Sequence, residues 1–333
     1  MIRSPILVVG CARSGTTLLY NILSEVAPLW SIGIESKAII ERFHHPSVKG
    51  WISGELTVAD LTAVSRAYIL GAFEAGAAPG YFWRRVNRFR ARLNHSATYV
   101  ALKRRGRTTS TGSGFSSGLP GGGLGVVRAY VRVRNRVMPA PASVRLLDKS
   151  PEHCLRLSFM TSLFPDARII FITRDGRANV HSLLEGWRQP HLFPGYDTPM
   201  PVTSPGQSRG RWAFTLIPGW REWVDRPLEE ICARQWTVSN GAVLDYIASP
   251  HSRPVLSVSY EDLIANPDAS LSQIAEFLNI APEDIPTFGH TLPEVNVVSQ
   301  PGFEKWRREE GTISRITPMI QPMMARLGYE SDR

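Results

Sequence analysis

The stretch that decides the fold is PILVVGCARSGTTLLYNILSEV, residues 5–26. It opens with a short run of branched aliphatic residues, 5–10, which predicts a strand buried on both faces. A glycine-containing turn follows, and residues 16–26 then place leucine, isoleucine and valine side chains on one face of a helix. The stretch therefore predicts a strand, a tight loop and a helix in immediate succession.

The loop between them has the glycine spacing of a phosphate-binding loop, G-x-x-x-x-G, in Gly10 and Gly15. Thr16 stands where such a loop carries lysine, Thr17 follows it, and the cation comes earlier, at Arg13. Backbone N–H groups of a glycine turn at a helix N-terminus attract an anion whatever the side chains. We therefore expect a phosphate-binding loop from which the usual lysine is missing, although the glycine spacing alone also fits a plain strand–helix connection.

Four more apolar segments predict strands, and three more periodic segments predict helices between them. The strands are expected at 98–102, 144–149, 167–174 and 254–260, and the helices at 178–187, 229–247 and 269–280. Strands that alternate with helices predict an α/β fold with a parallel, helix-covered sheet in three layers. Such sheets bind ligands beyond the carboxyl ends of their strands, where the glycine loop is expected.

The composition is typical of a soluble globular enzyme, with 43% hydrophobic and 20% charged residues in 333. The apolar run before Gly10 is too short for a signal-peptide core, and no apolar run is long enough for a membrane span. The three cysteines lie far apart and have no metal-site spacing, which is typical of a reducing compartment. We expect a cytoplasmic protein, with peripheral contact at a membrane left open.

The net charge of +9 is concentrated in one segment. Between Ala75 and Leu147 there are fourteen arginines and lysines and no acidic residue. Within it, residues 104–125 are rich in glycine and serine, which predicts a flexible loop. We expect a single domain over 1–333 with a basic insertion at about 77–145, and a local anionic partner in place of nucleic acid.

The expected strand ends are cationic, because the 144–149 segment ends in Lys149 and the 167–174 segment in Arg174. Neither offers the acidic group that holds magnesium in nucleoside triphosphatases, and the loop lacks the lysine that reaches their β and γ phosphates. A ligand with a 5′ anionic tail and no metal requirement fits this edge better than ATP with magnesium.

A second motif lies in RIIFITRDGRANVHSLL, residues 168–184, where Ser182 follows Arg174 by eight residues and falls in the next helix. A guanidinium at a strand end binds a phosphate through two hydrogen bonds, and a hydroxyl on the following helix donates a further hydrogen bond to it. The alternative for Arg174 is a surface ion pair with Asp175 or Asp166. Together with RSGTTLL, this motif resembles the nucleotide site of the sulfotransferases, which use 3′-phosphoadenosine 5′-phosphosulfate (PAPS).

The resemblance extends along the chain through three weaker segments in the family's order. These are LLDKSPEH at 146–153, VSYEDLIANP at 258–267 and FEKWRRE at 303–309. It implies a P-loop sulfotransferase fold without a metal, of the branch that includes tyrosylprotein and bacterial enzymes. The Lys-Thr-His segment of the cytosolic aryl branch is absent, and the basic insertion is unmatched.

The resemblance also suggests roles at the nucleotide. Arg13, the N–H groups of Ser14, Gly15, Thr16 and Thr17, and the two threonine hydroxyls would stabilise the leaving 5′-phosphate, with Arg174 and Ser182 on the 3′-phosphate. Tyr260 would touch the adenine, and Lys305 with Arg307 would close over the 3′-phosphate. Trp236 or Trp306 remains an alternative for stacking on the base.

For the chemical step, the resemblance favours Glu35 as the base that accepts the acceptor's proton. Lys149 would reach the bridging oxygen or the sulfuryl group; its alternative is a solvated strand-end lysine. His44, His45 and His153 compete with Glu35, since imidazole is basic enough at neutral pH. The alternative for Glu35 is a helix-capping or surface glutamate without a catalytic role.

The acceptor is expected to be a hydroxyl of a carbohydrate, a glycolipid or another small metabolite. The basic insertion would line the acceptor site or contact a membrane surface; the alternative is a solubilising loop. Two other functions stay open at this point: a degenerate P-loop kinase, and a non-catalytic protein that binds a nucleotide or an anionic surface.

Overall fold

The computed structural model describes residues 2–26, 28–32, 35–77, 143–193, 195–202, 210–286 and 304–329. Five strands of these residues form one parallel sheet in the order β2-β3-β1-β4-β7. The strands are β1 Ile6–Val9, β2 Leu29–Ser31, β3 Arg145–Lys149, β4 Arg168–Thr173 and β7 Val255–Ser259. The predicted α/β fold with a helix-covered parallel sheet is confirmed, and the predicted strand at 98–102 lies outside the described residues.

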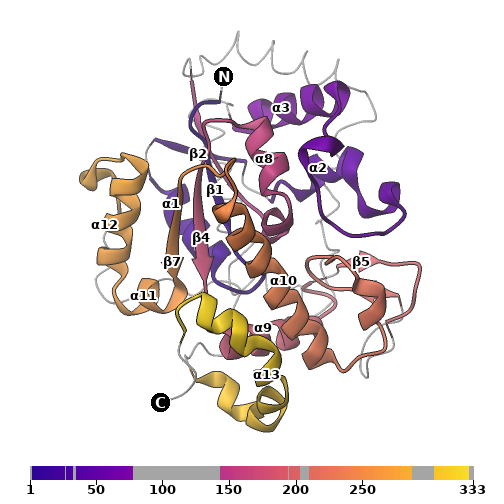
Figure 1. The fold of residues 1–333 in the computed structure, drawn as a ribbon. Helices are drawn as coiled ribbons and strands as arrows, with labels where there is room; N and C mark the ends of the chain where they lie inside the picture. The colour runs from indigo at the N-terminus through magenta and orange to yellow at the C-terminus, as the bar shows by residue number, and fades with distance from the viewer. Residues whose placement is uncertain are drawn as a thin grey trace.

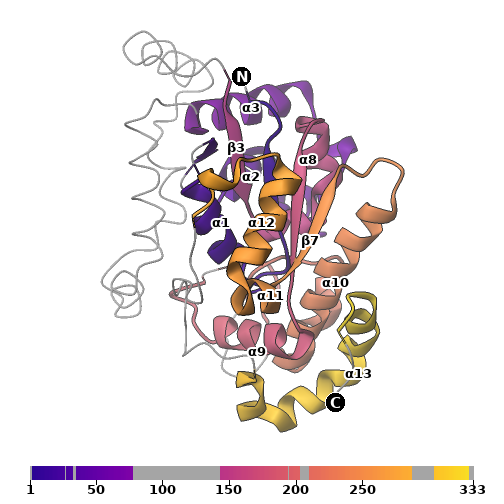
Figure 2. The same cartoon turned by 90° about the vertical axis from the view of Figure 1, so that its left-hand side faces the viewer.

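Helices cover both faces of this sheet (Figures 1 and 2). They are α1 Thr16–Ser24, α2 Lys37–His44, α3 Ala63–Ala77, α8 Leu157–Leu163, α9 Gly176–Trp187, α10 Leu228–Ala248, α11 Tyr260–Ala265, α12 Pro267–Leu278 and α13 Glu310–Arg326. A short antiparallel pair, β5 Tyr196–Asp197 and β6 Arg211–Trp212, lies outside the sheet. The predicted helices correspond to α1, α9, α10 and α12, each shifted by a few residues.

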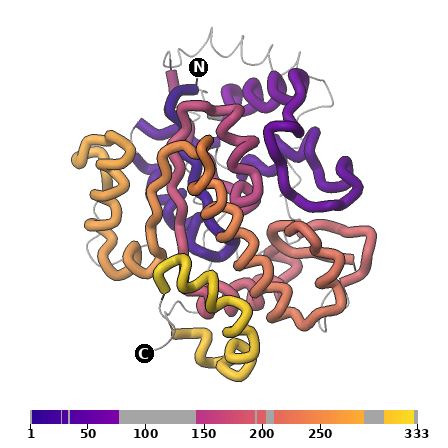
Figure 3. The backbone as a smooth tube through the Cα atoms, viewed as in Figure 1, coloured from indigo at the N-terminus to yellow at the C-terminus, as the bar shows by residue number. Residues whose placement is uncertain are grey.

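The alternation of side chains along the strands divides the core into two faces. Ile6 and Val8 of β1 pack with α1, α11 and α12, whereas Leu7 and Val9 pack with α2, α3, α8 and α10. A third cluster joins α9, α10 and α13 near the ends of β4 and β7, which places these helices at the carboxyl edge. Because β1 and β4 are parallel neighbours, the glycine loop after β1 and Arg174 after β4 lie at this same edge. Figure 3 shows the N-terminus at the opposite edge.

Among the helices of the described ranges, none has the length and apolar character needed to cross a bilayer. The basic insertion expected at about 77–145 lies mostly outside the described residues, and the single-domain division stays a prediction.

Candidate functional site

The loop between β1 and α1 is a tight turn that depends on its two glycines. Gly15 has a left-handed φ of 102°, and no side chain caps the first turn of α1 behind it. A Cβ atom on Gly15 would collide with the Tyr260 ring, and one on Gly10 would lie 2.5 Å from the carbonyl oxygen of Ile172. Arg13 also has a positive φ, of 71°. Within this strained turn the Ser14 N–H, predicted to face the 5′-phosphate, donates to the Cys11 carbonyl oxygen at 3.1 Å. The N–H groups that point to an anion site are therefore those at the start of α1, from Gly15 onward.

Arg174 and Ser182 meet Arg13 at this loop, although they lie 161 and 169 residues further along the chain. Arg174 follows β4 directly, and its Nη1 donates to the carbonyl oxygen of Arg13 at 2.9 Å. Ser182, on the buried side of α9, accepts from Nε of Arg13 at 3.2 Å. The two motifs are thus joined through both the backbone and the side chain of Arg13.

The ion pair that the sequence left open for Arg174 is not formed with either aspartate. Asp175 caps α9 and pairs with Arg177 at 2.8 Å, and Asp166 accepts from the backbone N–H of Ser4. The guanidinium of Arg174 lies instead 4.5 Å from the centre of the Tyr260 ring. It is therefore fixed by a carbonyl oxygen and an aromatic face, both of which leave its positive charge uncancelled.

The electrostatics of the loop favour an anion. Burial, together with the nearby charge of Arg174, lowers the pKa of Arg13 to about 10. Arg13 therefore keeps its positive charge at neutral pH, although its side chain is largely removed from solvent beside the Arg174 guanidinium. Within the described residues, Ser14 Oγ and Arg174 Nε are buried polar atoms with no hydrogen-bond partner. An anion with several acceptor oxygens would relieve both conditions.

Lys149 links the end of β3 to the loop and to Glu35. Its Nζ donates to Thr17 Oγ1 at 3.1 Å and forms an ion pair with the Glu35 carboxylate. The Lys149 side chain is 3% exposed and that of Glu35 is 44% exposed. The predicted base and the predicted cation therefore lie together beside the loop, and the carboxylate is the partner that reaches solvent.

The competing histidines are held elsewhere. His44 is buried against the Phe159 ring of α8, and burial lowers its pKa. His45 caps a short 3₁₀ helix by accepting from Ser47 N through Nδ1. His153 is fully buried against Asp148, with Nε2 at 2.8 Å from Oδ2. These contacts tie each of the three histidines to other residues, and none of these contacts is with Lys149 or Glu35.

The remaining predicted residues are divided between the loop and other places. Tyr260 packs its ring against Gly15 and Arg174. Lys305 pairs with Glu185 of α9 at 2.7 Å, and Glu185 is one of the charges that act on Arg13. Arg307 pairs with Glu304 and lies over Trp306, so its described contacts do not bring it to the loop.

The two tryptophans considered for base stacking belong to the core. Trp236 is fully buried against Gly176, and Trp306 is buried between the guanidiniums of Arg177 and Arg307. Phe193, which sequence reasoning missed, lies 4.8 Å from the Arg13 guanidinium and packs on Phe214. A single phenylalanine in an irregular segment carries no sequence signal that would have identified it.

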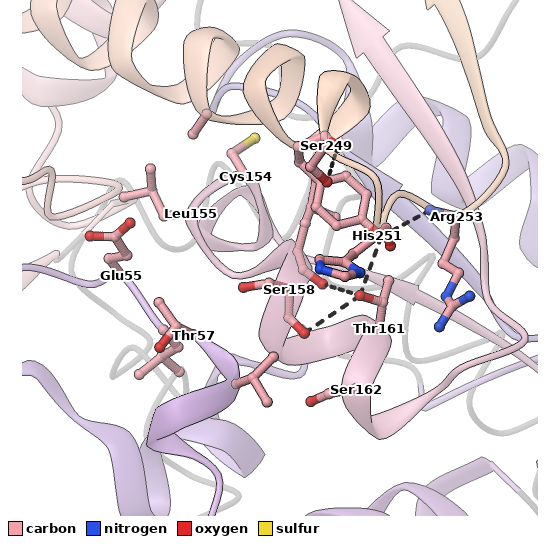
Figure 4. Close-up of a pocket in the computed structure, with 15 residues that line it drawn as sticks. Glu55, Thr57, Cys154, Leu155, Ser158, Thr161, Ser162, Ser249, His251 and Arg253 are labelled. Atoms are coloured by element: carbon pink, nitrogen blue, oxygen red, sulfur yellow. Dashed lines mark hydrogen bonds between the residues drawn. The ribbon is translucent and has the colours of Figure 1, made fainter.

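A cavity of about 470 Å³ lies between α8, α10 and the segment around Thr57 (Figure 4). Tyr246, Thr161, His251 and Arg253 are among its polar lining residues. None of the predicted nucleotide or catalytic residues lines it. It is therefore separate from the cluster at the loop.

Comparison with known proteins adds a family match. The sequence profile described as "Sulfotransferase family" matches residues 5–192, more than half of the chain. Protein-tyrosine sulfotransferase A of Caenorhabditis elegans is 25% identical over 203 residues, which cover 56% of this chain and 45% of that protein. Protein-tyrosine sulfotransferase of Drosophila melanogaster is 23% identical over 210 residues, 58% of this chain and 35% of that protein. The match thus spans less than half the length of either relative.

Two solved structures are also similar in outline. A sulfotransferase domain from the curacin biosynthetic pathway is 14% identical, covers 99% of both chains and has a TM-score of 0.48. A sulfotransferase from Alicyclobacillus acidocaldarius is 14% identical, covers 99% of this chain and 98% of that chain, and has a TM-score of 0.45.

Proposed function

Because this chain belongs to the sulfotransferase family, we propose that it transfers the sulfuryl group of PAPS to an acceptor hydroxyl by in-line displacement, without a metal ion. PAPS supplies the activated sulfuryl group, and the remaining roles belong to side chains of this chain. The observation that carries the proposal is the meeting of Arg174 and Ser182 with Arg13 at the glycine loop. Two phosphate motifs from distant parts of the sequence thereby form one cationic site.

The residues at the loop fit a nucleotide with anionic groups at both the 5′ and 3′ positions. Ser14 Oγ and Arg174 Nε are buried donors without partners in the described chain, and an anion offers acceptors to both. The Gly15 backbone and the uncapped first turn of α1 provide N–H donors on the 5′ side. Arg174 and Ser182 supply a guanidinium and a hydroxyl for a 3′-phosphate.

The Lys149–Glu35 pair supports the chemical step. Glu35 is the carboxylate with access to solvent, so it accepts the proton of the acceptor hydroxyl as the bond to sulfur forms. Lys149, whose ammonium already reaches Thr17, stabilises the charge that develops on the leaving oxygens. Arg13 and the loop N–H groups share that task because they surround the same edge of the sheet.

The proposal for the acceptor is a hydroxyl that belongs to a carbohydrate, a lipid or tyrosine. The basic segment of the sequence supports an anionic or amphipathic acceptor, at the cytoplasm or a membrane surface. The names of the relatives add tyrosine, an acceptor those proteins are named for. All these acceptors present the same reacting group to Glu35.

The kinase alternative is disfavoured by two side chains. The hydroxyl of Thr17, which would hold magnesium in a kinase, receives the ammonium of Lys149. Asp148, the acidic residue within β3 itself, is fully buried and bonded to Ser36. The Glu35 carboxylate at this point is already paired with Lys149, so a divalent cation would have to displace that ammonium to reach Thr17 or Glu35.

Binding of PAP, the desulfated product nucleotide, tests this proposal. We expect PAP to raise the thermal stability of the protein in the presence of EDTA. Arg174→Ala should weaken PAP binding about 10- to 100-fold and leave binding of adenosine 5′-phosphosulfate nearly unchanged, because the lost contacts are to the 3′-phosphate. Arg326→Ala, an exposed arginine paired with Asp245, is the matched control. A strict magnesium requirement, or equal losses for both nucleotides, would contradict the proposal.

A further inference from the structure

Ser36, Asp148 and His153 form a closed cluster next to the Lys149–Glu35 pair. All three side chains are fully buried. Ser36 Oγ donates to Asp148 Oδ2 at 2.7 Å, and His153 Nε2 lies 2.8 Å from the same oxygen. Ser36 Oγ and His153 Nε2 are 3.0 Å apart, so the three groups form a triangle around one carboxylate oxygen. This cluster takes no part in the roles assigned above.

The cluster and the catalytic pair are neighbours along both chain segments. Residues 35 and 36 face residues 149 and 148, so that Glu35 pairs with Lys149 and Ser36 with Asp148. Successive side chains of a strand point to opposite faces. Lys149 and Asp148 therefore contact residues 35 and 36 from opposite faces of β3, near its carboxyl end. His153, in the 3₁₀ helix Pro151–Leu155, braces the Asp148 carboxylate from behind.

Stability alone does not account for this arrangement. Asp148 Oδ1 and His153 Nδ1 are buried and have no hydrogen-bond partner among the residues that the structure describes. A partly satisfied buried polar network is less favourable than apolar packing of the same volume. What the cluster does supply is a fixed position for the backbone of residues 35 and 36.

We propose that Ser36, Asp148 and His153 are positioning residues that hold the Glu35 carboxylate in place against Lys149. This inference rests on the proposed function, because it assigns the cluster to the base of sulfuryl transfer. His153 acts through Asp148 and Ser36 and does not touch the acceptor, since its ring is fully buried. Ser36 is the link, as the only member of the cluster that adjoins Glu35 in the chain.

Substitution of Ser36 separates positioning from nucleotide binding. Ser36→Ala is expected to lower kcat about 10- to 100-fold, the cost typical of a lost orienting contact. The Kd for PAP should not change, because the residues assigned to the nucleotide phosphates do not contact Ser36. Ser36→Thr keeps the hydroxyl and should recover most of the rate. Ser270→Ala, a buried serine of α12, controls for the loss of a buried hydroxyl as such.

A double-mutant cycle with Glu35→Gln identifies the residue through which Ser36 acts. If Ser36 positions the Glu35 carboxylate, Ser36→Ala costs little or nothing once that carboxylate has been removed. An equal fold-loss in the wild-type and Glu35→Gln backgrounds would overturn the proposal. So would a fall in PAP affinity that matches the fall in kcat.

A readout that needs no sulfotransferase activity distinguishes failure of this inference from failure of the proposed function. The Lys149 amine is 3% exposed and is held by Glu35 and Thr17, so it should react slowly with an amine acylating reagent. Ser36→Ala should speed labelling of Lys149 severalfold, with Lys49 as the internal reference in mass spectrometry. Unchanged Lys149 labelling overturns the positioning role. Faster labelling in a protein that transfers no sulfuryl group would support the positioning of the pair and refute the proposed function.

Discussion

At the residue scale, the proposed site rests on two neighbouring arginines, Arg13 and Arg174. Arg13 is buried beside Arg174, and its lowered pKa of about 10 still leaves it protonated at neutral pH. Keeping two guanidiniums close together costs free energy that a bound anion returns. The sequence located both residues through the spacing of two motifs. That Arg13 itself would join them was not predicted, because the Arg13–Ser182 contact spans 169 residues of the chain.

Glu35→Gln tests the assignment of the base at this scale. The substitution keeps the shape of the side chain and removes the proton acceptor, so kcat should fall about 100-fold or more. PAP affinity should stay within a factor of about two, because the residues proposed to bind the nucleotide phosphates are unchanged. Steady-state kinetics and PAP titration measure the two effects separately. Unaltered turnover would exclude Glu35 as the base.

At the scale of elements, the connection between β1 and α1 depends on Gly15. Gly15 is required there for two reasons, its left-handed φ and the Tyr260 ring that fills the space of a Cβ atom. The loop is therefore fixed by its own backbone and also by α11, a helix from the far end of the chain.

Gly15→Ala should combine both penalties. We expect it to lose PAP binding and to destabilise the fold by about 2 kcal/mol or more, since the added methyl group displaces the Tyr260 ring. Gly50→Ala is the matched control, because Gly50 has a φ of 62° with open space around its Cα. That variant should carry the backbone strain alone and bind PAP normally. Thermal unfolding and PAP titration of the two variants decide the matter, and equal behaviour would contradict the steric account.

Packing of α2 on α8 makes a pH-dependent contribution through His44. Burial lowers the pKa of His44 below its ordinary value of 6.5. The unfolded chain therefore binds more protons than the folded one as pH falls below about 6.5, and stability is lost in that direction. His44→Phe removes the titration and keeps the ring beside Phe159. Its Tm should match wild type at pH 8 and exceed it by about 2 °C at pH 5.5. The same difference in Tm between variant and wild type at pH 8 and at pH 5.5 would contradict this.

Two of the elements that sequence reasoning missed have different physical causes. β2, Leu29–Ser31, has only three residues, too few for a periodic pattern, yet it directs the chain toward Glu35. α13 contains Pro318 and Pro322, which argue against a helix unless tertiary packing overrides them. The helices α2, α3, α8 and α11 were also missed. The apolar strands β1, β3, β4 and β7 were predicted, because burial on both faces of a parallel sheet leaves a direct signature in the sequence.

At the scale of the whole molecule, the parallel sheet gathers four distant segments at one edge. β1 brings the glycine loop, β3 brings Lys149, β4 brings Arg174, and the segment after β2 brings Glu35. The loop motif, the predicted strand ends and, for Glu35, the family resemblance identified each of these groups separately. Their mutual contacts could not be predicted, because they depend on a strand order that places β1 between β3 and β4.

The most direct test of the central claim is transfer of the labelled sulfuryl group from PAPS in the presence of EDTA. The purified protein is incubated with labelled PAPS and a host extract, and mass spectrometry identifies the compound that gains one sulfuryl group. The account predicts a labelled product with wild-type protein and no dependence on magnesium. With Glu35→Gln it predicts only a small residual amount of labelled product. Failure to label any acceptor at a PAPS concentration that saturates binding, or activity only with ATP and magnesium, would contradict it.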